Sequence, residues 1–378
     1  MGDVDGPPMR LPGSDQFVLV LGVWLLVAAV VVLVVAAVLR WRRRRRDPSA
    51  GWWSPGLVVG CVLLLLGVPM VVANRPLPFR TPEFPPLGDL VPPESFFNAT
   101  VERLPVAASS DRWIASQRDD AGRPLELVPG FEGRTTLGVV YGIPFNVVRA
   151  DTPRYDVDIV RYPQLSSPGP YPITDPAYIK SMPSYGIDNH YVGYDPETNT
   201  SWELIALRRW FGRWEADSGA VWDLDDLRYS DGTTTASGLP LLPGTITYDE
   251  VASGSVDHVV LGTTPVIRTE GFLWPARRTD GRVAGEDPPP MGAWMRLRAD
   301  ADVSRLGPQS QVVARALQRH GLVVSDTGGR FAMRGTPDAR WDDDDLATLS
   351  TLTSEDFEFV DATPLFVAAD TMAARPSP

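Results

Sequence analysis

Six arginines lie between two apolar runs near the start of the chain, and this arrangement limits the possible topology more than any other feature. They occupy position 40 and positions 42–46, in "LRWRRRRRDP". The run before them, Phe17–Leu39, carries no charged residue. At 1.5 Å per residue, a helix over this run is longer than the roughly 30 Å hydrocarbon core of a bilayer. We therefore expect a transmembrane helix over 17–39.

The second apolar run, Leu57–Ala73, is close to the shortest length that spans a bilayer, and it contains Pro69. Trp52 and Trp53 precede it, and tryptophan is enriched at membrane interfaces. These features predict a second transmembrane helix over 51–73.

The arginine run also predicts the orientation of the chain, because short arginine-rich loops remain in the cytoplasm. We expect the loop 40–50 inside the cell, and the tail 1–16 and everything after residue 73 outside. An alternative exports the same C-terminal part without a tether, since 42–73 also resembles a signal peptide with a cleavage site at 71–73. A nucleic-acid-binding role for the arginines conflicts with their position between two hydrophobic helices.

The acidic excess of the chain lies beyond the apolar runs. The whole chain has a net charge of −12, whereas residues 1–74 contain seven arginines and four aspartates. A strongly acidic exported part argues against nucleic acid as its partner. Cys61, within the second run, is the only cysteine. The exported part therefore has no disulfide, no thiolate metal site and no cysteine nucleophile.

Three segments are expected after the second run. Residues 74–97 are rich in proline and predict an extended linker. Residues 98–366 are expected to form an extracytoplasmic domain. Residues 367–378, rich in alanine and proline, are expected to be a disordered tail.

Short runs of alternating or apolar residues recur through 98–366, separated by glycine, proline, aspartate and serine. They predict an all-β fold, an antiparallel sandwich or jelly-roll-like arrangement, with two short helices. The helices are expected over 309–320, after Gly307-Pro308, and over 343–352, which opens with aspartates. The strand-like runs are "TTLGVVYGI", "YDVDIVRY", "HYVGYD", "SWELIAL", "GAVWDLDDL", "TITYDEV", "DHVVLGT" and "AWMRLRADAD".

The stretch 169–365 resembles a widespread group of exported bacterial proteins to which we attach no activity. The shared segments are "GPYPI" (169–173), "DNHYV" (188–192), "SGAVWDL" (218–224), "GLPLLPGTITYDEVASGSVDHVV" (238–260), "WPAR" (274–277), "PPPMGAWMRL" (288–297), "GLVVSDTGG" (321–329) and "RWDDDDL" (340–346). In that group histidine tends to follow "WPAR", whereas this chain has Arg278. The resemblance implies an exported, sheet-rich domain and implies no reaction.

Asp223 and Glu250 are the candidate catalytic acids, because each lies where acids alternate with aromatic and aliphatic residues on a predicted strand. Glycosidic cleavage requires two carboxyl groups roughly 5 to 10 Å apart, one as acid and one as base or nucleophile. His258, directly after Asp257, completes the candidate catalytic set, since an aspartate can orient an imidazole. The proton donor of such a pair needs a raised pKa.

The candidate substrate-binding residues lie at predicted strand ends and turns, where a rigid scaffold presents functional groups. They are Asp188, His190, Trp274, Arg277 and Asp326. Trp274 could stack on a sugar ring, and Arg277 could bind hydroxyls or a uronate. The structural alternative is that these polar groups pair with one another to stabilise strand ends. No cofactor and no metal site are expected.

Two function classes follow from these features. The first is a membrane-anchored extracytoplasmic protein acting on polysaccharide, most simply a glycoside hydrolase. The second is a non-catalytic cell-surface module that binds carbohydrate or another envelope partner. A converging pair of acids would favour the enzyme, whereas a binding surface without such a pair would favour the module.

Overall fold

The computed structural model of the protein describes residues 14–46, 55–73, 85–131, 142–175, 177–180, 189–210 and 212–378. The chain divides into two compact units, and each is described by itself. The first consists of 1–77, 182–187 and 208–214; the second consists of 78–181, 188–207 and 215–378.

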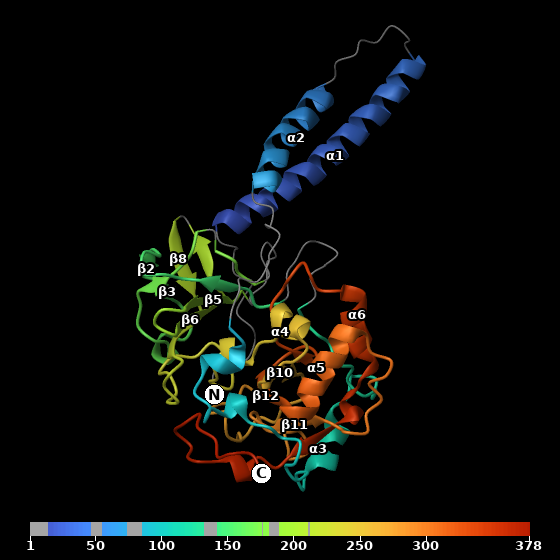
Figure 1. Cartoon of the computed structure of the whole chain (residues 1–378). Helices are drawn as coiled ribbons and strands as arrows, with labels where there is room; N and C mark the ends of the chain where they lie inside the picture. The colour runs from blue at the N-terminus through green and yellow to red at the C-terminus, as the bar shows by residue number, and fades with distance from the viewer. Residues whose placement is uncertain are drawn as a thin grey trace. The chain divides into compact units, whose positions relative to one another are not determined.

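Two long helices, α1 (Ser14–Arg46) and α2 (Pro55–Ala73), dominate the first unit (Figure 1). They confirm that both apolar runs are helical. The two helices approach closely, because a β-carbon at Gly60 of α2 would lie 2.5 Å from Leu33 Cγ of α1. A short strand, β7 (Arg208–Trp210), also belongs to this unit.

Among the residues described, one helical stretch is long and apolar enough to cross a membrane, Leu21–Leu39 of α1. Only 17% of its most apolar window is buried against protein. The apolar stretch described in α2, Val58–Val68, is shorter than the length required to cross a membrane. The structure therefore supports one candidate span instead of the two expected, and a signal sequence near the N-terminus would show the same features.

The second unit contains a five-stranded sheet with the strand order β13-β10-β12-β11-β14. Strands β10 and β12 are parallel, and the other neighbouring pairs are antiparallel. The strands are β10 (Val260–Thr264), β11 (Trp294–Leu297), β12 (Leu322–Thr327), β13 (Ala332–Met333) and β14 (Phe357–Val360).

Both faces of this sheet are buried, because successive apolar residues point to opposite sides of a strand. Val260 and Leu322 pack in one hydrophobic cluster together with Leu317 of the helix α5 (Pro308–Arg319). Their neighbours Leu261 and Val323 pack in a second cluster, on the other side of the sheet. The second cluster also contains residues of the other main sheet, so one continuous core connects the two sheets.

The other main sheet has four strands in the order β1-β5-β6-β9. Its strands are β1 (Phe145–Val147), β5 (Tyr191–Asp195), β6 (Thr200–Ile205) and β9 (Ser218–Asp223). Strands β5 and β6 pair antiparallel up to Asp195 opposite Thr200, so a tight turn connects them. Strand β1 pairs with β5 in parallel.

Two further short pairs complete the described strands. Strand β2 (Arg154–Tyr155) pairs antiparallel with β4 (Tyr171–Pro172). Strand β3 (Asp158–Ile159) pairs in parallel with the last residues of β8 (Arg213–Ala216).

The two predicted helices are present in the second unit. Helix α5 (Pro308–Arg319) covers one face of the five-stranded sheet (Figure 1) and ends before Gly321, whose positive φ of 73° favours glycine. Helix α6 (Asp343–Ala347) begins at the predicted aspartates and continues as a 3-10 helix over Thr348–Thr351.

The sheet-rich character expected from the sequence is confirmed, but the description as all-β and antiparallel is wrong. Three strand pairs are parallel in the described part of the chain. Two further helices, α3 (Ser110–Ser116) and α4 (Tyr248–Ser253), were not predicted. Helix α4 occupies the "TITYDEV" segment expected as a strand. The sandwich arrangement stays a prediction, and most of "TTLGVVYGI" lies outside the described residues.

The expected linker and tail differ from the structure where it describes them. Leu87, Leu90, Phe96 and Phe97 are buried in the second hydrophobic cluster, so 85–97 belongs to the folded unit. At the other end of the chain, Met372 is buried and its carbonyl accepts a hydrogen bond from Phe96 N. Apolar residues spaced among the prolines explain both differences, because they supply core surface that a solvated spacer or tail lacks.

Candidate functional site

A cleft of about 540 Å³ opens in the second unit beside helix α4. Residues 86–98 form one wall, and residues 247–257 form the other. Its polar lining residues are Asp89, Asn98, Thr247, Asp249, Glu250, Ser253, Ser255 and Asp257. Two of the predicted site segments, those around Glu250 and His258, therefore lie at this cleft.

Helix α4 begins with a reciprocal pair of hydrogen bonds that orients Glu250. The Thr247 side chain accepts from Glu250 N, and the Glu250 carboxylate accepts from Thr247 N at 3.1 Å and from Thr247 Oγ1 at 2.7 Å. This capping box satisfies amide groups that the first turn of a helix otherwise leaves unpaired. It also turns the Glu250 carboxylate back toward the interior.

The structure brings Glu250 and His258 together. Glu250 Oε1 lies 3.3 Å from His258 Nε2 and accepts a hydrogen bond from Leu87 N at 3.0 Å. His258 Nδ1 lies 2.9 Å from the Val259 carbonyl oxygen. Glu250 is 7% exposed and His258 is fully buried. The imidazole consequently cannot touch a ligand in the cleft directly.

Each member of this pair shifts the pKa of the other. Burial by itself raises the pKa of Glu250, but the charge and hydrogen bonding of His258 lower it overall, with help from Leu87 and Thr247. Burial likewise lowers the pKa of His258, whereas the charge of Glu250 raises it overall. Two opposite charges this close favour each other's ionised form. Between the two ordinary pKa values, 4.5 and 6.5, these directions favour a buried carboxylate facing an imidazolium.

The remaining acids of the cleft are closer to solvent. Asp249 pairs with Arg340 at 2.6 Å, and Asp257 pairs with Arg319 at 3.1 Å. The Asp89 side chain is exposed and forms no ion pair with the residues that the structure describes. The cleft thus presents carboxylate oxygens without an arginine among its lining residues.

His320, the third histidine, plays a structural role near this cleft, where its ring lies 3.9 Å from Asp257 Oδ1. Its Nδ1 lies 2.8 Å from the Ala99 carbonyl oxygen, and its ring is buried. Burial lowers the pKa of His320 to about 4, so the ring is neutral at physiological pH.

Asp223 does not join Glu250. It ends strand β9, its side chain is exposed, and its Oδ1 accepts from Asp225 N at 3.1 Å. It is absent from the cleft lining. The strand expected to carry Glu250 is a helix, and this difference removes the shared sheet face on which the pairing of the two acids was based.

The other predicted residues are distributed over the second unit. His190 is buried immediately before β5, and its carbonyl accepts from Lys180 N at 2.8 Å. Asp188, next to it in the sequence, lies outside the described residues.

Trp274 packs in an aromatic cluster instead of presenting a free face. Its ring stacks on Trp294 at 6.2 Å between centroids, with Phe96 and Phe366 against it edge-on. Its Nε1 donates to the Thr371 carbonyl at 2.9 Å. Arg277, on the same segment, is exposed and places its guanidinium 4.7 Å from the centre of the Tyr229 ring.

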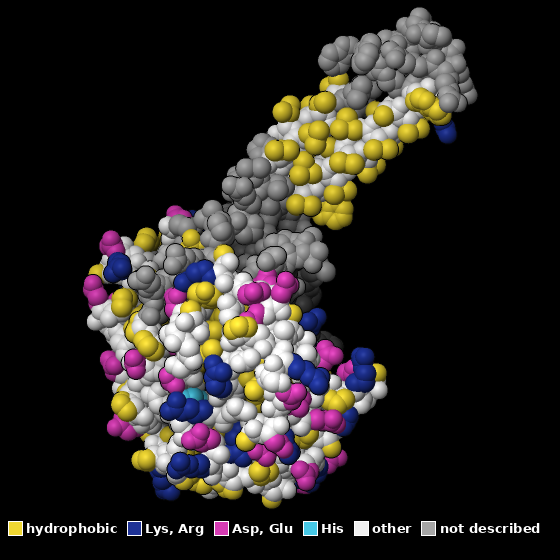
Figure 2. All heavy atoms as spheres, turned by 45° about the vertical axis from the view of Figure 1, so that its right-hand side comes forward, with side chains coloured by type: hydrophobic (Ala, Val, Ile, Leu, Met, Phe, Trp, Pro, Cys, Tyr) yellow, Lys and Arg dark blue, Asp and Glu magenta, His cyan; other side chains and the backbone are white. Residues whose placement is uncertain are grey.

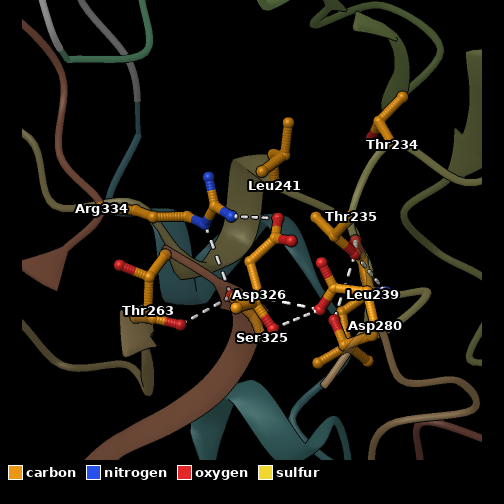
Figure 3. Close-up of polar contacts among 12 residues, drawn as sticks. Thr234, Thr235, Leu239, Leu241, Thr263, Asp280, Ser325, Asp326 and Arg334 are labelled. Carbon is orange, nitrogen blue, oxygen red and sulfur yellow. Dashed lines mark hydrogen bonds and ion pairs between the residues drawn. The ribbon is translucent and has the colours of Figure 1, made fainter. Parts of the chain in front are cut away.

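Asp326 forms an ion pair near the carboxyl end of β12 (Figure 3). Arg334 Nη2 donates to Asp326 Oδ2 at 2.7 Å, and Arg334 Nε lies 3.4 Å from Ser325 Oγ. The neighbouring Thr327 amide donates to Asp280. Asp326 thus pairs with Arg334, a residue outside the candidate set, at the end of this strand.

Glu203 is a buried acid that the sequence reasoning missed. It lies in β6, is fully buried, and accepts hydrogen bonds from Thr234 Oγ1 and from Leu241 N at 2.7 Å. Burial raises the pKa of Glu203 to about 7. The one available signal was an acid inside the otherwise uncharged run "SWELIAL".

The charge pattern of the surface differs between the two helices and the second unit. Figure 2 shows apolar side chains over the visible surface of α1 and α2, and acidic and basic side chains interspersed on the visible face of the second unit. No group of three or more histidine, cysteine or acidic side chains is arranged for a metal ion among the described residues. Comparison with family models, curated proteins and solved structures found no match.

Proposed function

We propose that the chain is a membrane-anchored protein whose second unit lies outside the cytoplasm. There it binds cell-envelope carbohydrate in the cleft beside α4, without cleaving it. The observation that carries this proposal is the composition of the cleft wall. Asp89 supplies a carboxylate acceptor for sugar hydroxyls that has no ion-pair partner among the described residues, and Asn98 adds an amide. Asp249 and Asp257 line the same cleft, paired with Arg340 and Arg319. Its volume of about 540 Å³ falls within the range of small-ligand sites.

The state of Glu250 favours binding over hydrolysis. The acid of a glycosidase holds a proton near neutral pH and therefore has a raised pKa. The pKa of Glu250 is lowered, and both of its carboxylate oxygens already accept hydrogen bonds. Asp223 does not line the cleft. The two candidate acids consequently do not supply the proton donor and the base of a glycosidase.

The proposed location rests on α1 and the arginines that follow its apolar stretch. Leu21–Leu39 is long enough to cross a bilayer, and Arg42–Arg46 follow it directly. Arginine next to a span favours the cytoplasmic side. The second unit then lies outside because the proposal includes a second crossing, by α2 (Pro55–Ala73), which returns the chain through the bilayer. Protease added to spheroplasts should digest the second unit and leave α1 protected. Complete protection of the second unit would place it in the cytoplasm and contradict the proposal.

Calorimetric titration of the detergent-solubilised full chain with envelope oligosaccharides tests the binding. We expect a saccharide to bind and Asp89→Asn to weaken binding about tenfold, because a hydrogen bond to a charged group contributes roughly 1.5–3 kcal/mol. Asp223→Asn is the matched control, since Asp223 is also exposed but lies outside the cleft.

Two results would overturn the binding proposal. One is the absence of saccharide binding, or equal binding by wild type and Asp89→Asn. The other is release of reducing ends that disappears in Glu250→Gln while the melting temperature is kept. That second result would favour the glycoside hydrolase.

A further inference from the structure

Helix α1 does not stop where its apolar stretch ends. It continues without interruption from Ser14 to Arg46, so Arg42–Arg46 form a helical extension of the candidate span. At 1.5 Å per residue, this extension reaches about 10 Å beyond Leu39. The headgroup layer on one side of a bilayer is roughly 5–8 Å thick. The arginines of a spanning α1 therefore lie at and just beyond the depth of the phosphate groups.

The helical positions of these arginines distinguish between possible partners. Successive residues of an α-helix are about 100° apart, so the five positions 42–46 are distributed around the whole circumference of α1. A protein docked on one side of the helix could contact only part of this ring. Headgroups that surround a single helix could contact all of it.

We propose that Arg42–Arg46 bind the phosphate groups of anionic phospholipids around the end of α1. This inference rests on the membrane anchoring proposed above. Arginine is suited to the role because its planar guanidinium donates two parallel hydrogen bonds to a phosphate. Trp41, exposed at the start of the extension, suits the same interfacial layer. The ring selects anionic over zwitterionic lipid next to the protein.

Spin-labelled lipids in vesicles containing the full-length chain test this selection. The fraction of motionally restricted label gives the association of phosphatidylglycerol relative to phosphatidylcholine. We expect a preference for phosphatidylglycerol of roughly fivefold or more. One arginine near an anionic surface contributes about 1 kcal/mol, which corresponds to this factor. The preference should decrease as the salt concentration rises, because the interaction is electrostatic.

A fivefold variant with Arg42–Arg46 changed to Gln should lose the preference. The matched control changes five exposed arginines of the second unit to Gln and should keep it; these are Arg112, Arg123, Arg228, Arg298 and Arg305. Equal association of both lipids with the wild type would overturn the inference, as would a preference that survives in the Arg42–Arg46 variant.

Alkaline extraction of the same vesicles separates this inference from the proposal on which it rests. If the wild-type chain resists extraction but shows no lipid preference, α1 is inserted and the lipid-binding inference alone is contradicted. If alkaline buffer releases the wild-type chain, the anchoring itself fails.

Discussion

At the scale of single residues, two buried glutamates of the second unit have their charge balanced in different ways. Glu250 faces the imidazole of His258, and the pKa of Glu250 is lowered. Glu203 accepts hydrogen bonds from a threonine hydroxyl and backbone amides, and burial raises its pKa to about 7. Opposite effects of pH on stability follow from these two environments.

The Glu250–His258 pair should stabilise the fold most between the ordinary pKa values of its members, 4.5 and 6.5. Its contribution is lost as pH rises through the raised pKa of His258 and as pH falls through the lowered pKa of Glu250. Removing one member of a buried pair costs about 3–5 kcal/mol. Glu250→Gln should therefore lower the free energy of unfolding most within this window, as measured by denaturant titration from pH 4 to 9. A loss that does not vary with pH would contradict the pair.

Glu203→Gln is expected to change the pH dependence of stability in a different direction from Glu250→Gln. In the wild type, the raised pKa of Glu203 gives stability that is present below pH 4.5 and lost as pH rises through about 7. The difference between these two values corresponds to about 3 kcal/mol. A neutral glutamine removes this pH dependence, while its amide can still pair with Thr234 and accept from Leu241. Melting curves at pH 5 and pH 8 test this. An equal change of melting temperature between the two pH values in the variant and the wild type would contradict it.

At the scale of elements, helix α4 depends on its capping box. Thr247→Ala removes the side-chain bonds to Glu250 N and to the Glu250 carboxylate. Loss of such a cap costs about 1 kcal/mol or somewhat more. The melting temperature should fall in Thr247→Ala and be largely kept in Thr247→Ser, which retains the hydroxyl. Equal melting temperatures for the two variants would show that the cap does not hold α4.

The same element shows how far the sequence predicted the structure. Helix α5 was predictable because Pro308 opens it and Gly321 follows it, both local signals. The Thr247-x-x-Glu250 spacing was an equally local signal for α4, but the alternation of "TITYDEV" favoured a strand. The parallel pairing of β10 with β12 was not predictable in this way, because it joins segments about sixty residues apart through tertiary packing.

At the scale of the whole molecule, the sequence predicted an exported, sheet-rich unit following two transmembrane helices. The structure agrees on the sheets and on both apolar runs being helical, and supports one candidate span. It did not predict that residues 85–97 and the C-terminal residues pack into the core, as Leu87 and Met372 do. Proline and alanine indicate solvated chain on average. Whether a few apolar residues among them are buried depends on their tertiary contacts with the core. The local sequence does not show these contacts.

The candidate site was predicted only in part for a related reason. Glu250 and His258 lie together, as the candidate set placed them, across a sequence separation short enough for one helix and one turn; their role stays a prediction. Asp223 was grouped with them because both acids were expected on strands of one sheet. Glu250 lies on helix α4 instead, so the two acids share no sheet face. The cleft wall formed by residues 86–98 was assigned to a linker, so its acid Asp89 and amide Asn98 were not considered.

Hydrogen exchange on the full-length chain, with and without a bound envelope oligosaccharide, tests the central claim most directly, because it locates the ligand. Carbohydrate bound in the cleft should slow amide exchange in residues 86–98 and 247–257, the two walls. The Asp89→Asn variant should lose this protection at the same saccharide concentration. Protection confined to other segments of the second unit, with both walls unchanged, would contradict binding in the cleft.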